Sequence, residues 1–406
     1  MYCACYCIFV FFTVIFNAAG YNRICNLLYL PFFILSAAFV LRHKLALYTG
    51  DIWLMVFCLI VAASAFGNGF GAEGVRSCYS VVSLCGMVIL SGKVLEKEDL
   101  VYVERSYVAG ALVLGLWAFL AYLRAPDTRL GDGIAANSIN VGITLAFCSM
   151  FLMRDMVRYG MKKYVLLYGI SMLLLLLTRS RGPAVIAGLA SVLIFASVKY
   201  KQGARIYKIS GYTVNRNMKR KAGIAVVAVC LLFLAVSGGY IQKYLWRFQE
   251  FFTVMSTERP GPASGSTGVR MYLKILGFQE FMKRPLWGYG AGSAKAFLSG
   301  SYFHDNLIQI AYEMGIAGLA GYYIPHGRCF FRLLRKKSYF PAILTAMLLL
   351  DGVFDVVFHS KIFYIIFSIC NLYLNQTEHG REEADDENTS CDSFRFKVRK
   401  RSFLFY

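Results

Sequence analysis

The sequence FHDNLIQ at residues 303–309, followed by EMGIAG at 313–318, decides how this chain can fold. It leads from a polar segment with one histidine directly into an apolar run that continues to residue 327. A glycine-rich segment, GYGAG at 288–292, comes just before it. Because an apolar run of about 20 residues crosses a bilayer as a helix, the stretch predicts a membrane span whose mouth is polar and flexible.

The composition predicts the same class for the whole chain. Of its 406 residues, 58% are hydrophobic and 16% are charged, and the mean hydropathy is +0.53. These values exclude a soluble globular domain, so we predict an all-α, polytopic membrane protein. Length and apolarity predict about twelve spans. They fall near residues 3–20, 24–41, 51–67, 78–94, 104–123, 138–153, 164–178, 183–198, 222–239, 306–327, 339–355 and 360–375.

The connections between the spans predict an orientation, because Lys and Arg resist export across the membrane. The connection 199–221 is rich in Lys and Arg and has no acidic residue. Three further basic connections begin at Arg42, Arg154 and Arg328. All of them fit one topology with both termini in the cytoplasm, which leaves 240–305 as a large outer loop.

This outer loop carries eight Lys or Arg and four Asp or Glu. A loop longer than about 60 residues escapes the positive-inside rule, so its basic excess needs another reason. An anionic ligand and anionic lipid head groups both satisfy that need. Residues 270–283 have apolar residues at helical spacing and end at Arg284-Pro285. We predict a helix there, lying in the outer interface.

The short outer connections contain arginine but no lysine, and a guanidinium can hold a phosphate with two parallel hydrogen bonds. Their arginines are Arg23, Arg76, Arg124, Arg129, Arg179 and Arg181. For Arg23 and Arg76 we attribute the bias to chance. The segment 178–183, TRSRGP, places two arginines at a helix start and predicts a diphosphate site. Snorkelling arginines that anchor the interface are the alternative.

The motifs of the outer loop resemble the signature of the O-antigen ligase and polymerase family. The resemblance covers Arg270 and the helix that follows it, PLWGYG at 285–290, His304 with a nearby asparagine, and EMGI at 313–316. Residues 178–182 are similar to the Ser-Arg-Gly element of that family, and residues 129–137 resemble its earlier outer-loop element. The match spans most of residues 100–375. Asp305 stands where the family usually has Asn, and Ala136 where it has Pro.

The resemblance implies a multi-pass protein of the bacterial inner membrane whose active site faces the periplasm. Such an enzyme takes a glycan from undecaprenyl diphosphate and transfers it to a sugar hydroxyl, with inversion and without a metal or other cofactor. Its partners would be the lipid-linked donor, a glycan or lipid-linked acceptor, membrane lipids and a chain-length regulator, but no nucleic acid. We favour polymerisation of surface-polysaccharide repeat units; ligation of finished glycan to lipid A-core is the alternative.

The resemblance also assigns residues. Arg181 and Arg270 would hold the diphosphate, and His304 would orient or deprotonate the acceptor hydroxyl, a role for which an imidazole is suited. A structural histidine that caps the following span is the alternative. Further residues assigned to the lipid diphosphate or the glycan are Arg179, Arg129, Gly288, Gly290, Asp305 and Asp355. Domain 1–376 would be the membrane enzyme, and 377–406 a disordered cytoplasmic tail.

The positions of the polar residues bear on two alternatives, a metal-dependent enzyme and a flippase or transporter. Asp351, Asp355 and His359 recur every four residues, which predicts one helix face and raises the question of a metal site. Three ligands spread over more than two turns suit a single ion poorly, so Asp355 is instead expected to pair with an outer arginine. A flippase or transporter would carry ionisable residues at midplane on broken helices. The predicted spans have almost none, which favours the enzyme.

Overall fold

The computed structural model describes residues 1–406 except 20, 44–46, 68, 70, 97, 126–127, 135–136, 160–161, 203–264 and 390–406. The described chain is helical, as predicted. Its helices are α1 (Tyr2–Ala18), α2 (Asn22–His43), α3 (Thr49–Gly67), α4 (Ala72–Val94), α5 (Asp99–Arg124), η1 (Asp132–Ile134), α6 (Ser138–Tyr159), α7 (Lys162–Leu177), α8 (Arg181–Gln202), α11 (Gly265–Lys283), α12 (Ser293–Phe297), α13 (Asn306–Arg335), α14 (Tyr339–Phe354) and α15 (Lys361–Thr389).

Each predicted span coincides with one of these helices, apart from 222–239, which lies outside the described residues. Five of them, α2 to α6, are long and apolar enough to cross a membrane. Four shorter helices are also apolar: Tyr2–Ala18, Arg181–Ser197, Tyr339–Phe354 and Lys361–Asn375. The total of about twelve spans stays a prediction. Helix α15 continues to Thr389, beyond the predicted domain boundary at residue 376, and the disordered tail stays a prediction.

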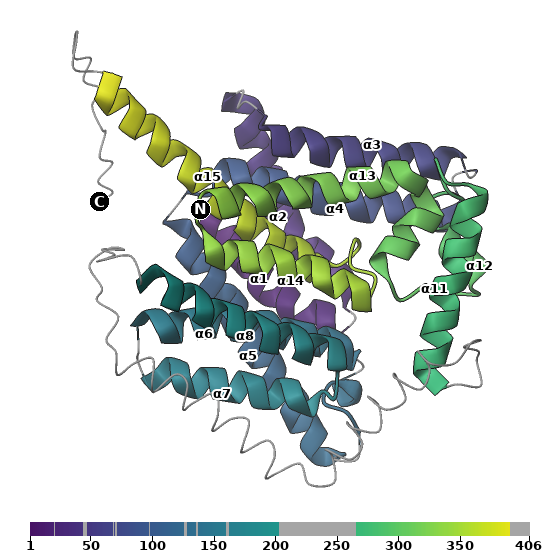
Figure 1. Ribbon diagram of the computed structural model, residues 1–406, viewed down its shortest axis with the longest axis horizontal. Coiled ribbons are helices and arrows are strands. Elements are labelled where there is room, and N and C mark those ends of the chain that lie inside the picture. The colour runs from purple at the N-terminus through teal and green to yellow at the C-terminus, as the bar shows by residue number, and fades with distance from the viewer. Residues whose placement is uncertain are drawn as a thin grey trace.

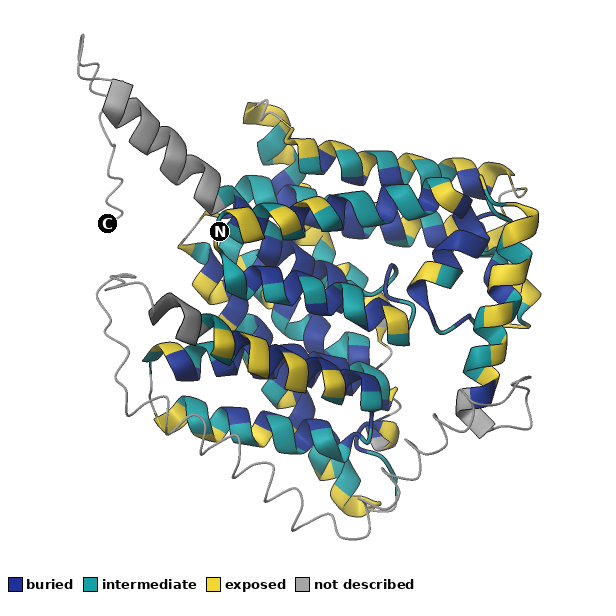
Figure 2. Cartoon of the chain, viewed as in Figure 1, coloured by how far each residue is buried: buried dark blue, intermediate teal, exposed yellow. Residues whose placement is uncertain are grey.

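The helices form a bundle in which most axes run side by side (Figure 1). In the most apolar stretch of α6, 78% of the residues are buried, against 17% in α2. Thus α6 is a central helix, whereas α2 presents apolar side chains outward; they include Leu27, Leu30, Ile34 and Leu41. Figure 2 shows that exposed residues also follow α3 at the edge of the bundle. An apolar surface of this extent is characteristic of contact with lipid.

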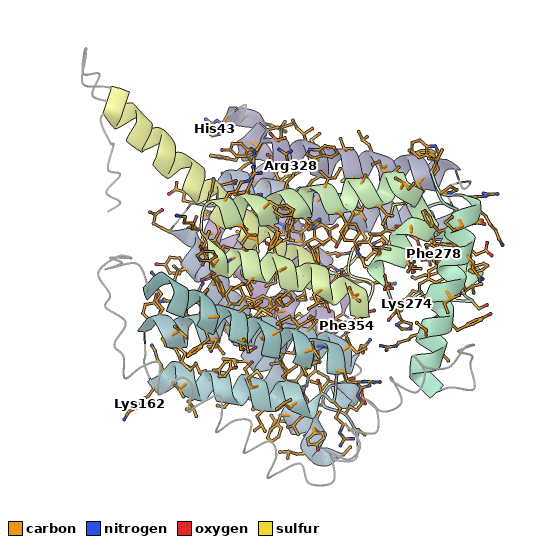
Figure 3. The ribbon with its side chains drawn as sticks, viewed as in Figure 1. His43, Lys162, Lys274, Phe278, Arg328 and Phe354 are labelled. Carbon is orange, nitrogen blue, oxygen red and sulfur yellow. The ribbon has the colours of Figure 1, made fainter. Side chains whose placement is uncertain are left out.

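Helix α11 lies across one end of the bundle, with α12 beside it (Figure 1); we call this the α11 end. The helix predicted over 270–283 is thereby confirmed as a helix, although it begins earlier, at Gly265. His43 and Lys162, which belong to the predicted cytoplasmic connections, lie at the end away from Lys274 and Phe278 (Figure 3). The predicted inner and outer connections therefore occupy different ends of the bundle.

Buried ion pairs lie at the end of the bundle opposite α11. Lys93 Nζ lies 2.8 Å from Asp51 Oδ2, and both side chains are almost fully buried. Arg154 Nη1 donates to Glu104 Oε1 at 2.7 Å. Removing one partner of a buried pair costs about 3–5 kcal/mol, because the other charge is left without compensation. From the sequence, Arg154 was predicted only to mark a cytoplasmic connection.

Helix α13 is interrupted at Gly315, whose φ of 63° and ψ of −158° are not helical. The segment before α12 pairs with the interrupted turn. Tyr289 N donates to Tyr312 O at 2.9 Å, Gly290 N to Glu313 O at 2.8 Å and Ile316 N to Pro285 O at 2.8 Å. The two family motifs, 285–290 and 313–316, are therefore hydrogen-bonded to each other.

Replacing Gly315 by Ala should destabilise the protein by about 3 kcal/mol or more. The added Cβ would clash with the backbone carbonyl of Leu286, and a residue with a Cβ is strained at this positive φ. Thermal unfolding of the purified protein in detergent measures the loss. Gly188→Ala is the matched control, because a Cβ there meets nothing within 4 Å. Equal melting temperatures of the Gly315→Ala variant and the wild type would contradict the close contact between residues 285–290 and the interrupted turn of α13.

Candidate active site

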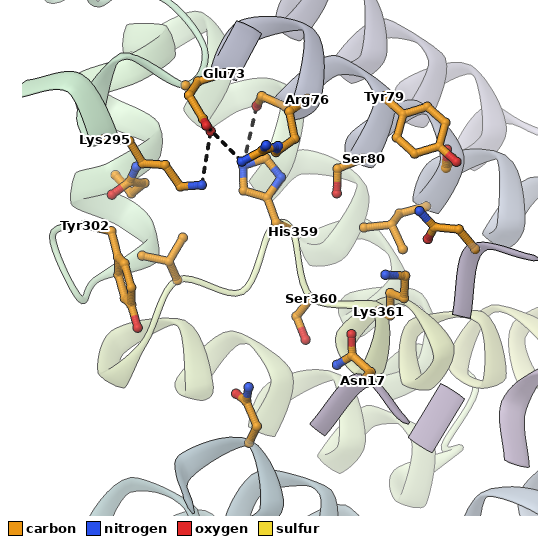
Figure 4. A pocket seen from close by; sticks show the side chains of 18 of the residues that line it. Asn17, Glu73, Arg76, Tyr79, Ser80, Lys295, Tyr302, His359, Ser360 and Lys361 are labelled. Carbon is orange, nitrogen blue, oxygen red and sulfur yellow. Dashed lines mark hydrogen bonds and ion pairs between the residues drawn. The ribbon is translucent and has the colours of Figure 1, made fainter. Parts of the chain in front are cut away.

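A polar cavity of about 820 Å³ lies at the α11 end, bounded by α1, α2, α4, α12, α13 and the segment between α14 and α15. From α4, Glu73, Arg76 and Ser80 line it, and His359 and Lys361 face them from the α14–α15 side (Figure 4). Its size is within the range of small-molecule and cofactor sites. Of the nine residues assigned from the sequence, Asp355 alone lines this cavity.

Arg270 and His304 lie next to the cavity, behind Tyr302. The rings of Tyr302 and His304 are 4.3 Å apart between centroids, and Tyr302 itself lines the cavity. Burial, followed by the negative charge of Asp355, raises the pKa of Tyr302 to about 12, and the positive charge of Arg270 opposes this rise. The structure therefore brings Arg270, Tyr302, His304 and Asp355 into one electrostatic group.

His304 is held in an unusual state. Its φ is 55°, and its buried Nδ1 has no hydrogen-bond partner among the described residues. Burial lowers the pKa of His304 to about 4, and the positive charges of Arg270 and Lys274 contribute to this shift. The imidazole is therefore neutral near pH 7 and can accept a proton.

Both carboxylate oxygens of Asp305 have partners within the protein. Oδ1 accepts hydrogen bonds from the N–H groups of Leu307 and Ile308 at 3.0 and 3.1 Å, which caps α13. Oδ2 lies 2.8 Å from Lys274 Nζ, and that amine also donates to Val353 O at 3.0 Å. Asp305 thereby joins the start of α13 to α11 and, through Lys274, to the end of α14.

Asn306, the first residue of α13, binds the segment between α14 and α15. Its Oδ1 accepts hydrogen bonds from Val357 N at 3.0 Å and from Phe358 N at 2.9 Å. These bonds hold the segment between α14 and α15 against α13. The residues next to His304 therefore fix its position from two directions.

The turn between α7 and α8 carries Arg179 and Arg181 to the same region. Arg129 supports this turn, since its Nε donates to Thr178 O and its Nη2 to Ser180 Oγ, both at 3.1 Å. Gly182 packs against Phe354, where an added Cβ would lie 3.0 Å from the Phe354 ring. Arg181 therefore begins a helix beside the end of α14.

Gly288 and Gly290 have a backbone role in the structure. A Cβ at Gly288 would come 2.5 Å from the Glu313 backbone, and Gly290 N donates to Glu313 O. Of the three glycines in this segment, Gly292 lines the cavity. The two glycines allow α12 to approach α13 closely, and in doing so they shape the cavity wall.

The prediction that Asp351, Asp355 and His359 lie on one face of a helix was wrong. Helix α14 ends at Phe354, and Asp355 is extended with φ −154° and ψ 172°, so the three residues share no helix. His359 instead faces α4, with Nε2 3.4 Å from Ser77 Oγ. Burial, and next the positive charge of Lys295, lowers the pKa of His359 to about 3.

Most residues of the cavity wall were not predicted from the sequence. Arg23 and Arg76, set aside as chance, both line the cavity, as do Glu73 and Lys295. The absence of lysine from the short outer connections was the available signal. A residue of α2 and a residue of α4 meet in one cavity only because of the tertiary fold.

The fold and the site define a helical membrane protein with a polar, ligand-sized cavity at one end of an apolar bundle. A family model described as O-antigen ligase matches residues 165–323, a region that contains most of α7, all of α8, α11 and α12, and the first part of α13 as far as residue 323. This match confirms the resemblance read from the motifs and supports membership of the O-antigen ligase and polymerase family. No curated protein matches the chain.

Replacing Asp305 by Asn should lower the free energy of unfolding by about 1–3 kcal/mol. Asn can still cap α13 but cannot form the largely buried ion pair with Lys274. Asp305→Ala should cost about 1 kcal/mol more, because it also removes the cap. Denaturation in detergent followed by circular dichroism measures both. Lys283→Met, which removes an exposed ion pair with Glu280, should leave the unfolding midpoint unchanged. Equal effects of the Asn and Ala variants would contradict the capping role.

Proposed function

We propose that this protein is a glycosyltransferase that moves a glycan from undecaprenyl diphosphate to the hydroxyl of an acceptor sugar. The observation that carries the proposal is the group formed by Arg270 and a neutral His304 behind the wall of a polar cavity. It occurs in a chain whose residues 165–323 match an O-antigen ligase family model. The active site would lie at the periplasmic face of the bacterial inner membrane.

In the proposed reaction the acceptor oxygen attacks the anomeric carbon from the side away from the diphosphate, which inverts that carbon. The bond between this carbon and the diphosphate oxygen breaks, and the lipid diphosphate leaves with the electron pair. Arg270 and Arg181 would stabilise the charge that grows on it, as guanidinium groups do in a site that excludes water. No metal is required for this step.

His304 would take the proton of the attacking hydroxyl. A group with a pKa near 4 is a weak base. Burial is the main cause of this low pKa, and the positive charges of Arg270 and Lys274 lower it further. A bound diphosphate offsets these positive charges and raises the pKa of His304. The donor would thus strengthen the base that the next step needs, and the free enzyme would keep a poor base that does not activate water efficiently.

For the acceptor we propose another repeat unit of the same surface polysaccharide, so that the enzyme is a polymerase. Amide and hydroxyl side chains suited to sugar hydroxyls line the cavity, among them Asn17, Asn26, Ser80, Ser83 and Asn140. Asp355 and Tyr302 also line the cavity, and the charge of Arg270 acts on both of them. A sugar bound in the cavity would therefore lie beside a donor held by Arg270.

Arg181→Lys and Arg270→Lys should each reduce transfer by about 100-fold, because an ammonium cannot reproduce the two-point hold on the diphosphate. Glycan length in a strain that lacks the gene, complemented with each variant, measures this. Arg124→Lys is the control, since this arginine ends α5 and lies outside the cavity lining. Single repeat units in the deletion strain indicate a polymerase, and long chains left on the lipid indicate a ligase. Glycans that are unchanged in the deletion strain would refute the proposed enzymatic function.

The pH dependence should show the effect of the donor on His304. Transfer requires the neutral imidazole, so activity is lost as the pH falls through the pKa of His304. For the free enzyme that pKa is about 4, and the bound diphosphate raises it. The acid limb of kcat should therefore lie at higher pH than the acid limb of kcat/KM. Coincident limbs, or an unchanged profile in a His304→Gln variant with residual activity, would exclude His304 as the base.

A further inference from the structure

A buried amide in the first turn of α13 has hydrogen-bond partners on both of its sides. Gln309 is 4% exposed. Its Oε1 accepts a hydrogen bond from Phe303 N at 3.1 Å, and its Nε2 donates to Glu313 Oε1 at 2.6 Å. Gln309 and Glu313 both line the cavity, but the proposed transfer step uses neither of them. Two hydrogen bonds in series therefore connect a carboxylate in the cavity wall to the peptide that precedes His304.

The backbone at His304 needs support from both sides. A residue with a Cβ is strained at its φ of 55°, and such a conformation persists only where neighbouring contacts hold it. On the C-terminal side, Asp305 and Asn306 supply these contacts. On the N-terminal side, the N–H group of Phe303 donates to Gln309. Gln309 thus completes the support of the strained residue.

Glu313 determines which way the Gln309 amide points. An ionised carboxylate only accepts hydrogen bonds, so the NH2 group of Gln309 has to face Glu313, and the amide oxygen is left for Phe303 N. An amide rotated by 180° would place its NH2 group against the N–H group of Phe303, where two donors would meet. The carboxylate therefore keeps Gln309 in the orientation that holds the peptide before the histidine.

Glu313 has a well-defined position of its own. It is 1% exposed, and its backbone oxygen accepts hydrogen bonds from Gly290 N at 2.8 Å and from Ser64 Oγ of α3 at 3.1 Å. The charge of its carboxylate also interacts with Lys295 of α12. The two hydrogen bonds through Gln309 thus tie the peptide before the histidine to a residue that α3 and α12 hold in place.

The ring of Phe303 is held independently of these hydrogen bonds. Its centroid lies 5.0 Å from that of Tyr312. On the α11 side it packs against Gly277, where an added Cβ would come 2.8 Å from the ring. Loss of the Gln309 side chain would therefore leave this aromatic contact in place and release the peptide N–H that precedes His304. The effect should be felt at the histidine rather than throughout the fold.

We infer that Gln309 and Glu313 are positioning residues that hold the His304 imidazole where it takes the proton of the acceptor hydroxyl. Glu313 orients the amide of Gln309, and Gln309 holds the peptide before the histidine. Both act through His304 and not on the reacting atoms. The inference rests on the proposed glycan transfer and adds to it two residues that set the geometry of its base.

The first test titrates His304 by NMR on the full-length protein in lipid nanodiscs, with labelled histidine rings and a His304→Gln variant to assign the signal. In the wild type its pKa is about 4, mainly because of burial. Gln309→Leu should raise the pKa toward the ordinary histidine value of about 6.5, because a released imidazole gains contact with water. Glu313→Gln should not raise it, since its side-chain oxygen can still accept from Gln309. An unchanged pKa in a folded Gln309→Leu variant would overturn the inference.

Tyr373→Phe is the matched control for a general loss of stability. The Tyr373 hydroxyl donates to Glu104 Oε1 at 2.7 Å, at the end of the bundle opposite α11. Its removal should lower the melting temperature, as the loss of Gln309 does, but leave the pKa of His304 and kcat at their wild-type values. An equal rise of the His304 pKa in this control would attribute the shift to general loosening and overturn the positioning role.

The second test measures transfer kinetics. Gln309→Leu should lower kcat by about tenfold or more and leave the donor and acceptor KM unchanged, because a displaced base slows the chemical step but not binding. Gln309→Glu sets two carboxylates against each other and should also lower kcat. The double variant Gln309→Glu/Glu313→Gln should recover most of the wild-type kcat. Its carboxylate can accept from both Phe303 N and the new amide, which restores the two hydrogen bonds with donor and acceptor exchanged.

The outcomes separate this inference from the proposed function. A raised acceptor KM with unchanged kcat would make Gln309 a glycan-binding residue and overturn the positioning role. A double variant no more active than Gln309→Glu would contradict the two hydrogen bonds in series. Absence of transfer in the wild type would refute the proposed function, while the titration, which needs no substrate, would still decide whether Gln309 holds His304.

Discussion

The α11 end of this protein depends on the backbone exchange at the break in α13. A helix that crosses lipid must satisfy all of its backbone groups internally, and irregular backbone at membrane depth is tolerated only where protein covers it. Here the break at Gly315 exposes carbonyl and amide groups that the segment 285–290 then satisfies. The exchange fixes α11 and α12 against the bundle. His304 and Lys295 are carried by the chain that follows, so the positions of both depend on it.

Charge is treated differently at the two ends of the bundle. At the end away from α11, Lys93 and Asp51 neutralise each other in a buried pair, and Arg154 is bound by Glu104. At the α11 end, cations outnumber the carboxylates that can reach them, and Glu73 is shared by two of them. Unbalanced positive charge destabilises a fold through self-repulsion. Its presence around a polar cavity is therefore better explained by an anionic ligand than by stability.

The sequence predicted the helices well, because an apolar run of the required length admits few other structures in a membrane. It also predicted that Arg270, His304 and Asp355 would belong to one region. It failed where the answer required tertiary contacts. Four-residue spacing placed Asp355 and His359 on one helix, but α14 ends at Phe354 and the two residues face different neighbours. The motif assigned Gly288 and Gly290 to the ligand, which stays a prediction, but it gave no sign of the hydrogen bonds that join this segment to the backbone of α13.

The segment between α14 and α15 gives the site its geometry. The backbone N–H groups of Val357 and Phe358 in this segment donate hydrogen bonds to Asn306 Oδ1. Lys274 Nζ donates to Val353 O and so holds the end of α14. The charge of Arg270 acts on Asp355 at its start, and Lys361 at its end lines the cavity. Because hydrogen bonds hold this short segment at Val353, Val357 and Phe358, it can keep the Asp355 carboxylate and the Lys361 amine at a fixed distance from each other on the cavity wall.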